Sequence, residues 1–236
     1  MKRFIAILLA CIPVALGLSC ASVDPSEKYP NMVADMDPIS AGTIEAEFDR
    51  MFSSKLNKVE VDAIFYPRLN EVSLEFRYEF VRYRQFWNER GRQQFAEAVN
   101  RYKDDYTSRN LASKYSKSRA IYGKTKGRVE WETFKYTTTH RSSPNIEMGY
   151  RFRGDMPFFA TLQRSAKEEG VSGDGPELES LQINMYFTRA QAEALVQKFD
   201  QAYLLGLLGK TKEEPQAGAA TEDSYLEYEE QDVSIH

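Results

Sequence analysis

The stretch from Val72 to Phe80 alternates apolar and polar side chains without interruption. Its apolar positions are Val72, Leu74, Phe76, Tyr78 and Phe80. Its polar positions are Ser73, Glu75, Arg77 and Glu79. Because successive side chains of a β-strand point to opposite faces, this strand has one apolar face and one charged face. The pattern is typical of an antiparallel sheet with one buried and one solvated side.

Further alternating runs predict about six strands in all. They are centred on Val59 to Phe65, Val129 to Thr133, Ile146 to Phe152, Phe158 to Leu162 and Leu181 to Phe187. In each run apolar residues recur two apart, mostly with polar residues between them, and the first run ends at Pro67.

Helical spacing predicts three helices around these strands. Ile44, Phe48, Met51, Phe52 and Leu56 predict a helix over Thr43 to Asn57, and a similar spacing predicts one from Asn88 to about Arg109. The third begins after Thr188, since Thr188 and Gln191 form a capping-box pattern. The expected order is α-ββ-α-ββββ-α, an α+β fold with an antiparallel sheet of about six strands and helices mainly on one face.

Composition divides the rest of the chain into three segments beside the domain expected at residues 43–210. Residues 1–19 form an export signal, and residues 20–42 form a polar, proline-containing tether. Residues 211–236 carry eight acidic residues against one lysine, a net charge of −7, which predicts a disordered acidic tail.

The N-terminal segment has the features of an export signal. Lys2 and Arg3 precede an apolar run of fifteen residues from Phe4 to Leu18. This run is shorter than the ~20 residues that cross a bilayer as a helix, so we expect it to be removed.

The residues around Cys20 resemble the lipobox of bacterial lipoproteins, in a relaxed form similar to that of spirochaetes. Ser19 supplies the small residue before the cysteine, whereas Gly17 and Leu18 depart from the usual pattern. The resemblance implies that Cys20 becomes the acylated N-terminus, and Ala21 and Ser22 resemble the sequence of an outer-membrane lipoprotein facing the periplasm. The alternative is a soluble periplasmic protein that begins at Ser22. Cys20 would be the only cysteine of the mature chain, which excludes an internal disulfide.

The inventory of catalytic and metal-binding side chains is thin. The chain has two histidines, His140 and His236, and neither has a partner at catalytic or metal-ligand spacing. Glu130 and Glu132 flank Trp131 on a strand, an arrangement more typical of solvated carboxylates than of a glycosidase pair. We therefore expect no enzyme activity, no metal site and no cofactor.

A strongly basic region is the main unexplained signal. Between Arg77 and Arg128 there are fourteen basic and five acidic residues, a net charge of +9. Export makes nucleic acid an unexpected partner, so the candidate partners are anionic lipid, an acidic envelope polymer or another envelope protein. Alternatively, acidic segments such as the tail neutralise this region. The candidate surface consists of Arg82, Arg84, Arg90, Arg92, Arg101, Lys103, Arg109, Lys114 and Lys117.

These observations favour a non-enzymatic binding or scaffolding module, tethered to a membrane of the cell envelope. A second hypothesis is a carrier of a hydrophobic or lipid ligand, because the element order resembles that of helix-grip lipid-binding domains. An enclosed apolar cavity would favour the carrier, and a filled core would favour the tethered module. A cell-envelope hydrolase is the third, disfavoured hypothesis.

Overall fold

The computed structural model describes residues 28–50, 53–111, 119–133, 138–170 and 178–213. Cys20, Lys114, Lys117 and residues 214–236 of the expected tail lie outside these ranges. The strands are β1 (Ile39–Arg50), β2 (Ser53–Tyr66), β3 (Glu71–Tyr78), β4 (Val81–Asn88), β5 (Arg119–Lys126), β6 (Arg128–Thr133), β7 (His140–Ser142), β8 (Asn145–Arg153), β9 (Met156–Gln163), β10 (Ala166–Lys167), β11 (Glu179–Ser180) and β12 (Ile183–Phe187). The helices are α2 (Glu89–Thr107), α3 (Arg189–Phe199) and α4 (Gln201–Glu213).

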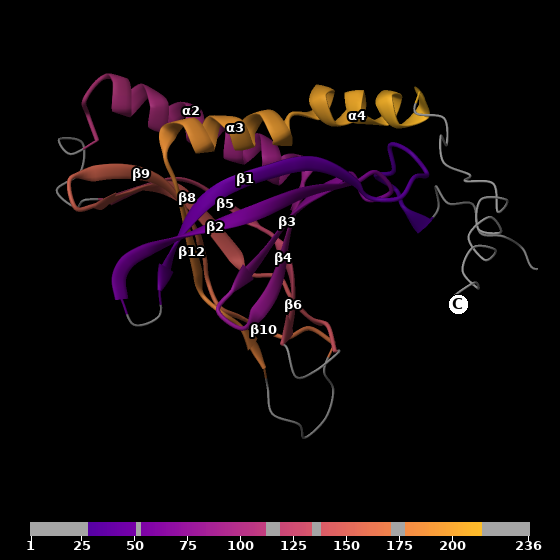
Figure 1. Ribbon diagram of the computed structural model, residues 1–236, viewed down its shortest axis with the longest axis horizontal. Helices are drawn as coiled ribbons and strands as arrows, with labels where there is room; N and C mark the ends of the chain where they lie inside the picture. The colour runs from indigo at the N-terminus through magenta and orange to yellow at the C-terminus, as the bar shows by residue number, and fades with distance from the viewer. Residues whose placement is uncertain (1–27, 51–52, 112–118, 134–137, 171–177, 214–236) are drawn as a thin grey trace, which may run out of the picture.

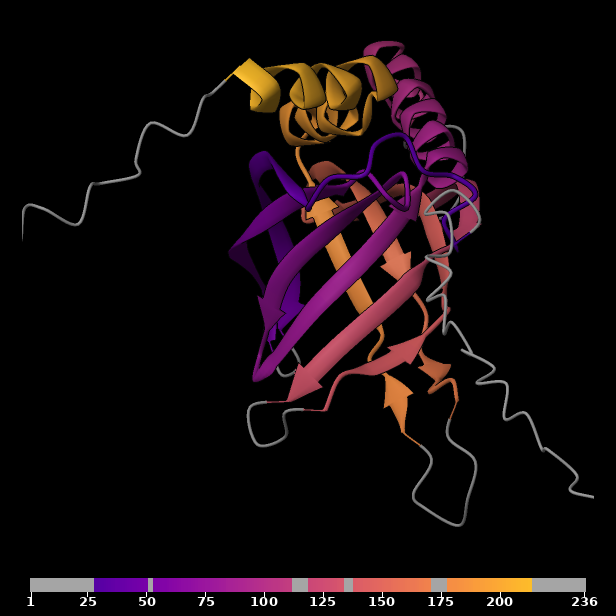
Figure 2. The same cartoon turned by 90° about the vertical axis from the view of Figure 1, so that its right-hand side faces the viewer.

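Ten of the strands form one antiparallel sheet in the order β5-β8-β9-β12-β1-β2-β3-β4-β6-β7. The sheet curls into a half-barrel, and the helices lie along one side of it (Figure 1 and Figure 2). β10 and β11 form a separate two-stranded sheet. The predicted α+β layout with about six strands is therefore wrong, because the described chain is mostly sheet.

The largest error concerns Thr43 to Asn57, which forms the β1–β2 hairpin instead of a helix. Ile44 and Phe48 are four residues apart, a spacing that places side chains on one face of a helix and also on one face of a strand. Ala46, between them, is also fully buried, so the burial follows the strand period of two. β1 pairs with β2 and β12, and it begins at Ile39, within the segment that the sequence predicted as tether.

Several local predictions are confirmed. β3 occupies Glu71–Tyr78, and α2 begins after Asn88, whose side chain accepts a hydrogen bond from the Gly91 amide. The capping box of α3 is present, since the Gln191 amide donates to Thr188 Oγ1 at 3.3 Å and the Thr188 amide donates to Gln191 Oε1 at 2.8 Å. The last predicted helix is divided at Asp200, whose extended backbone separates α3 from α4.

Gly127 allows the chain to pass from one end of the sheet order to the other. β5 and β6 are consecutive in the chain, yet β5 is an edge strand and β6 lies near the opposite edge. A Cβ atom at Gly127 would lie 2.6 Å from Ile146 Cδ1 and 3.3 Å from the Phe86 carbonyl oxygen, so any larger residue at this close crossing would force the buried Ile146 side chain to shift.

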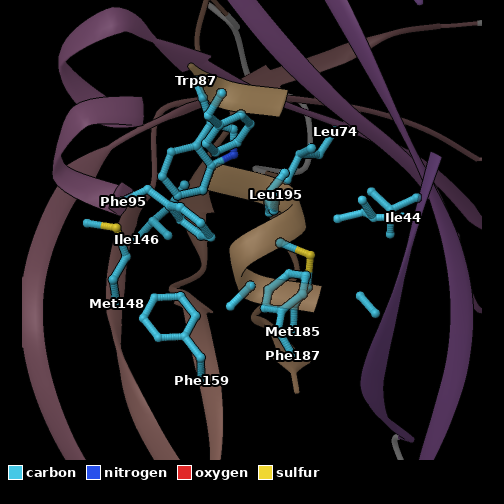
Figure 3. Packing of buried hydrophobic residues seen from close by; sticks show 14 of the residues in the cluster. Ile44, Leu74, Trp87, Phe95, Ile146, Met148, Phe159, Met185, Phe187 and Leu195 are labelled. Carbon is cyan, nitrogen blue, oxygen red and sulfur yellow. The ribbon is translucent and has the colours of Figure 1, made fainter. Parts of the chain in front are cut away.

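The hydrophobic core lies between the curled sheet and helices α2 and α3. α2 packs on β4, β5 and β8, while α3 packs on β1, β9 and β12. Figure 3 shows aromatic and aliphatic side chains from both halves of the sheet gathered around Leu195 of α3. The labelled members of this cluster include Trp87, Phe95, Phe159, Phe187 and Leu195, and all are buried.

One polar bridge crosses the apolar interior. Gln85 Nε2 donates to Gln163 Oε1 at 2.8 Å, although β4 and β9 are not neighbours in the sheet. Trp87 Nε1 donates in turn to Gln85 Oε1 at 2.9 Å. Both glutamines are buried, and the bridge satisfies polar groups that would otherwise be costly in the core.

Candidate functional site

Three of the seven described residues of the predicted anionic-partner surface have acidic partners. Arg82 pairs with Glu75 at 3.3 Å, and Arg84 pairs with Glu132 at 2.7 Å. Lys103 pairs with Glu193 at 3.3 Å. These pairs neutralise much of the charge that made the sequence of this region strongly basic.

Arg92 lies in the interior, only 2% exposed, and therefore does not belong to a surface. Its guanidinium donates to the carbonyl oxygens of Asn70, Trp87 and Phe199 at 2.8–3.2 Å, and to Gln201 Oε1. Burial lowers the pKa of Arg92 to about 10. Arg92 thus joins the start of α2 to the β2–β3 turn and to the α3–α4 junction.

Arg101, Arg90 and Arg109 are the remaining described members of the predicted surface, and all three are exposed. Arg101 donates to the Tyr122 carbonyl oxygen at 3.0 Å. Arg90 lines an open recess of about 550 Å³ that is bordered by asparagine and glutamine side chains. Within the described residues, Arg90 and Arg109 have no ion-pair partner.

Arg109 lines a groove of about 440 Å³ where the end of α2 meets the start of α3 and the β8–β9 hairpin. We call it the arginine–aromatic groove. It is formed by Tyr106, Arg109, Leu111, Phe152, Pro157 and Arg189.

The local sequence places Arg109 in an unusual backbone conformation at the end of α2. Its φ is +54°, in the left-handed region that favours glycine. The Asn110 amide donates to the Asp105 carbonyl oxygen at 2.8 Å, which closes the last helical turn around Arg109. A side chain at such a position costs about 1 kcal/mol relative to an unstrained residue, and retained strain of this kind is a reason to look for function.

Two buried tyrosines hold the floor of the groove. The Tyr102 hydroxyl donates to the Pro157 carbonyl oxygen at 2.8 Å, and the Tyr150 hydroxyl donates to the Leu111 carbonyl oxygen. Burial raises the pKa of Tyr102. Tyr106 packs edge-on against Tyr102 at 5.9 Å between ring centroids, and Phe152 does so against Tyr150 at 6.0 Å. The groove therefore has an apolar floor that is fixed by hydrogen bonds to the backbone.

Arg189 supplies the second cation of the groove. It is the first residue of α3, and its guanidinium carbon lies 5.2 Å from the centroid of the Tyr106 ring. Its contact with Glu193 is long, at 3.9 Å, and its side chain is 52% exposed. Two guanidinium groups beside an apolar floor suit a ligand that joins an anionic group to an apolar part.

The acidic and histidine residues considered for catalysis have structural contacts. Glu130 binds Arg128 at 2.5 Å, Arg141 at 2.9 Å and Arg84 at 3.5 Å. His140 Nδ1 lies 2.8 Å from Glu168 Oε1, and the ring stacks on Trp131. Sequence spacing did not reveal this His140–Glu168 pair because 28 residues separate its members.

The described residues contain no group of three or more His, Cys, Asp or Glu side chains arranged to hold a metal ion. None of the described helices has the length and apolar character needed to cross a membrane.

Sequence comparison relates the chain to spirochaete proteins. The family model described as "Uncharacterised Treponema protein" matches residues 39–205, which run from the start of β1 into α4. An uncharacterized protein of Treponema pallidum (strain Nichols) is 22% identical over 175 residues, which cover 74% of this chain and 61% of the relative. The chain thus spans less than two thirds of that relative's length. No solved structure matches the chain. The family model covers more than half of the chain, and the chain therefore belongs to this family of Treponema proteins.

Proposed function

We propose that the protein is a membrane-anchored lipoprotein of the cell envelope that works as a non-enzymatic binding module. Cys20 carries the acyl chains, and the arginine–aromatic groove takes an anionic partner. Membership of a Treponema family supports the anchor, because the relaxed lipobox around Cys20 resembles those of spirochaetes. Its expected location is the outer membrane, facing the periplasm.

The observation that carries the binding proposal is that two guanidinium groups, neither of them closely ion-paired among the described residues, lie beside aromatic rings in one groove. Arg82, Arg84 and Lys103 are ion-paired, whereas Arg109 has no ion-pair partner among the described residues and Arg189 has only a long one. Unneutralised guanidinium groups beside aromatic rings bind carboxylates and phosphates well, because they offer paired donors and little competing hydration.

The filled core favours a ligand site on the surface over one inside the sheet. Side chains from the strands, α2 and α3 occupy the interior (Figure 3), and the groove opens at the margin of that cluster, where its lining residue Leu111 is itself a core residue. We therefore propose an amphiphile with one anionic group, bound with its charge at the arginines and its apolar part on the Tyr106 side of the groove.

The groove is tested by titrating octyl phosphate into the purified protein and measuring the heat of binding. We expect Arg109→Ala combined with Arg189→Ala to weaken binding about tenfold or more, since a hydrogen bond to a charged group contributes about 1.5–3 kcal/mol. Arg90→Ala is the matched control, because Arg90 is an exposed arginine on α2 outside the groove. Equal affinity in the wild type, the double variant and the control would exclude the groove as the site.

The anchor is tested separately by cell fractionation. We expect the wild type in the membrane fraction and the Cys20→Ala variant in the soluble fraction, because the substitution removes the only thiol available for acylation in the mature chain. A variant that remains with the membrane would contradict acylation of Cys20 as the anchor.

A further inference from the structure

Helix α4 exposes apolar side chains on the face that should be polar in a solvated surface helix. From Ala202 to Gly209 it contains no charged residue. Leu205 is 43% exposed, and Leu208, one turn further along, is half-buried. Tyr203 is 40% exposed but lies on a different face, because residues two apart do not share a helix face. A surface helix normally presents polar groups opposite its buried stripe, so the outer face of α4 is suited to an apolar environment.

The position of α4 is fixed by contacts on its other face. Leu204 is fully buried, and the Tyr203 hydroxyl donates to the Ala41 carbonyl oxygen of β1 at 3.2 Å. Asp200 accepts a hydrogen bond from the Tyr203 amide at 2.8 Å, as a capping residue does. The exposed apolar face is therefore held in a defined direction.

The described chain begins at the same corner of the molecule where α4 begins. The Val33 amide donates to the Pro67 carbonyl oxygen at 3.0 Å, which ties the N-terminal segment to the β2–β3 turn. In the same turn, Asn70 Oδ1 accepts from Gln201 Nε2, the first residue of α4, at 3.2 Å. Figure 1 shows the start of the described chain and α4 at the same end of the molecule.

Chain length then limits how far this end can be from an anchored bilayer. Lys28, the first described residue, is eight residue steps after Cys20. Fully extended, they span at most about 29 Å. If Cys20 is acylated, Lys28 lies within this distance of the membrane, at the end of the domain that carries α4.

We propose that α4 lies in the headgroup region of the phospholipid bilayer to which Cys20 anchors the chain, an inference that rests on the proposed lipid anchor. Its thirteen residues are too few to cross the bilayer, but they suffice for a helix lying in the interface. Leu205 contacts the acyl boundary, and Lys210 at the end of the apolar run meets phosphate groups.

This orientation presents the arginine–aromatic groove away from the membrane. The groove is at the start of α3, whereas α4 continues from the other end of α3 toward the opposite side of the molecule (Figure 1). The anchored domain thus offers its binding site to the periplasmic space.

The test uses acylated full-length protein reconstituted into vesicles of phosphatidylcholine and phosphatidylglycerol that contain a headgroup-attached quencher. A bimane label is placed at Leu205→Cys or at the matched control Met156→Cys, which is 58% exposed at the groove end of the molecule. Acylation blocks the thiol of Cys20, so the introduced cysteine reacts selectively. We expect the quencher to reduce bimane fluorescence at position 205. Bimane fluorescence at position 156 should stay unchanged.

The possible results separate the helix from the anchor. Vesicles that co-float with the protein but leave position 205 unquenched would overturn the placement of α4 and leave the lipid anchor intact. Protein that fails to co-float would overturn the anchor and the placement together. Pyrene excimer emission from position 205 would assign the face to a second copy of the chain and would also overturn the proposal.

A second variant tests the contact without a label. The Cys20→Ala protein keeps only the weak vesicle affinity that α4 supplies, and in this background Leu205→Glu should weaken binding about tenfold, because a carboxylate replaces an apolar group at the interface. Leu178→Glu is the control, since Leu178 is similarly exposed on another part of the molecule. Equal loss in both variants would contradict a specific role for α4.

Discussion

Substitution of Arg109 by glycine should make the protein more stable and less able to bind its ligand. The left-handed backbone at Arg109 costs a residue with a Cβ about 1–2 kcal/mol, and glycine avoids this cost. Glycine also makes the unfolded chain more flexible, which offsets about 0.4–1 kcal/mol of that gain. The expected net stabilisation is about 0.5–1 kcal/mol, or about 1–3 °C in the midpoint of thermal unfolding.

The same substitution should weaken ligand binding, although it stabilises the fold. Arg109→Gly removes one of the two guanidinium groups of the arginine–aromatic groove, so octyl phosphate should bind about tenfold more weakly. Arg109→Ala separates the two effects, because it removes the charge and keeps the backbone strain. We expect it to lose affinity without the gain in stability.

Thermal unfolding by calorimetry and ligand titration on the three proteins measure both quantities. The reasoning would be refuted if Arg109→Gly were destabilised, since the backbone at residue 109 would then carry no relievable strain. It would also be refuted if both variants kept the affinity of the wild type, because Arg109 would then contribute nothing to the groove.

Three further predictions concern the scaffold. Gln85→Leu should lower the free energy of unfolding in urea by about 2–4 kcal/mol, because it leaves Gln163 without its partner. Adding Gln163→Leu should restore part of the loss. If the effects of the two substitutions on the free energy were additive, that result would contradict the bridge. Burial alone would raise the pKa of Glu147, but the hydrogen bond from Lys124 and the charge of Arg164 outweigh it and lower the pKa. The stabilisation from Glu147 is therefore present above its ordinary pKa and lost as pH falls through the lowered value. Lys124→Ala should bring acid unfolding to a higher pH. An unchanged pH of acid unfolding would exclude this linkage. Thr188→Ala should cost about 1 kcal/mol in the same urea assay through loss of the α3 cap, and a neutral result would show that the capping box contributes little.

The local sequence pattern was sufficient to predict an element where that pattern fits only one type of secondary structure. The strict alternation of Val72 to Phe80 leaves no helical alternative, and β3 is a strand. The capping box at Thr188 and Gln191 likewise identifies the start of α3 from four neighbouring residues.

Sequence reasoning failed where one spacing fits both a helix and a strand. It also failed where residues far away in the chain determine the local structure. The four-residue spacing of Ile44 and Phe48 fits both helix and strand, and only pairing with β2 and β12 selects the strand. β4 was not predicted because Gln85 places a polar residue at an inward position. Its partner, Gln163, lies 78 residues away in the chain.

The candidate site was only partly accessible from the sequence for the same reason. Net charge pointed to Arg109, but it could not show that Arg82 and Arg84 are neutralised across the sheet by acids on neighbouring strands. Arg189 was not considered, because it joins the groove only when the start of α3 packs beside the end of α2. Its position directly after the capping residue Thr188 was the local signal that could have identified an exposed cation.

Mass spectrometry of the mature N-terminus, on protein extracted from its native membrane, tests the lipid anchor most directly. We predict a chain that begins at Cys20 and carries the added mass of a diacylglyceryl group. An unmodified N-terminus at Ser22 would contradict membrane anchoring and would make the same domain a soluble periplasmic protein.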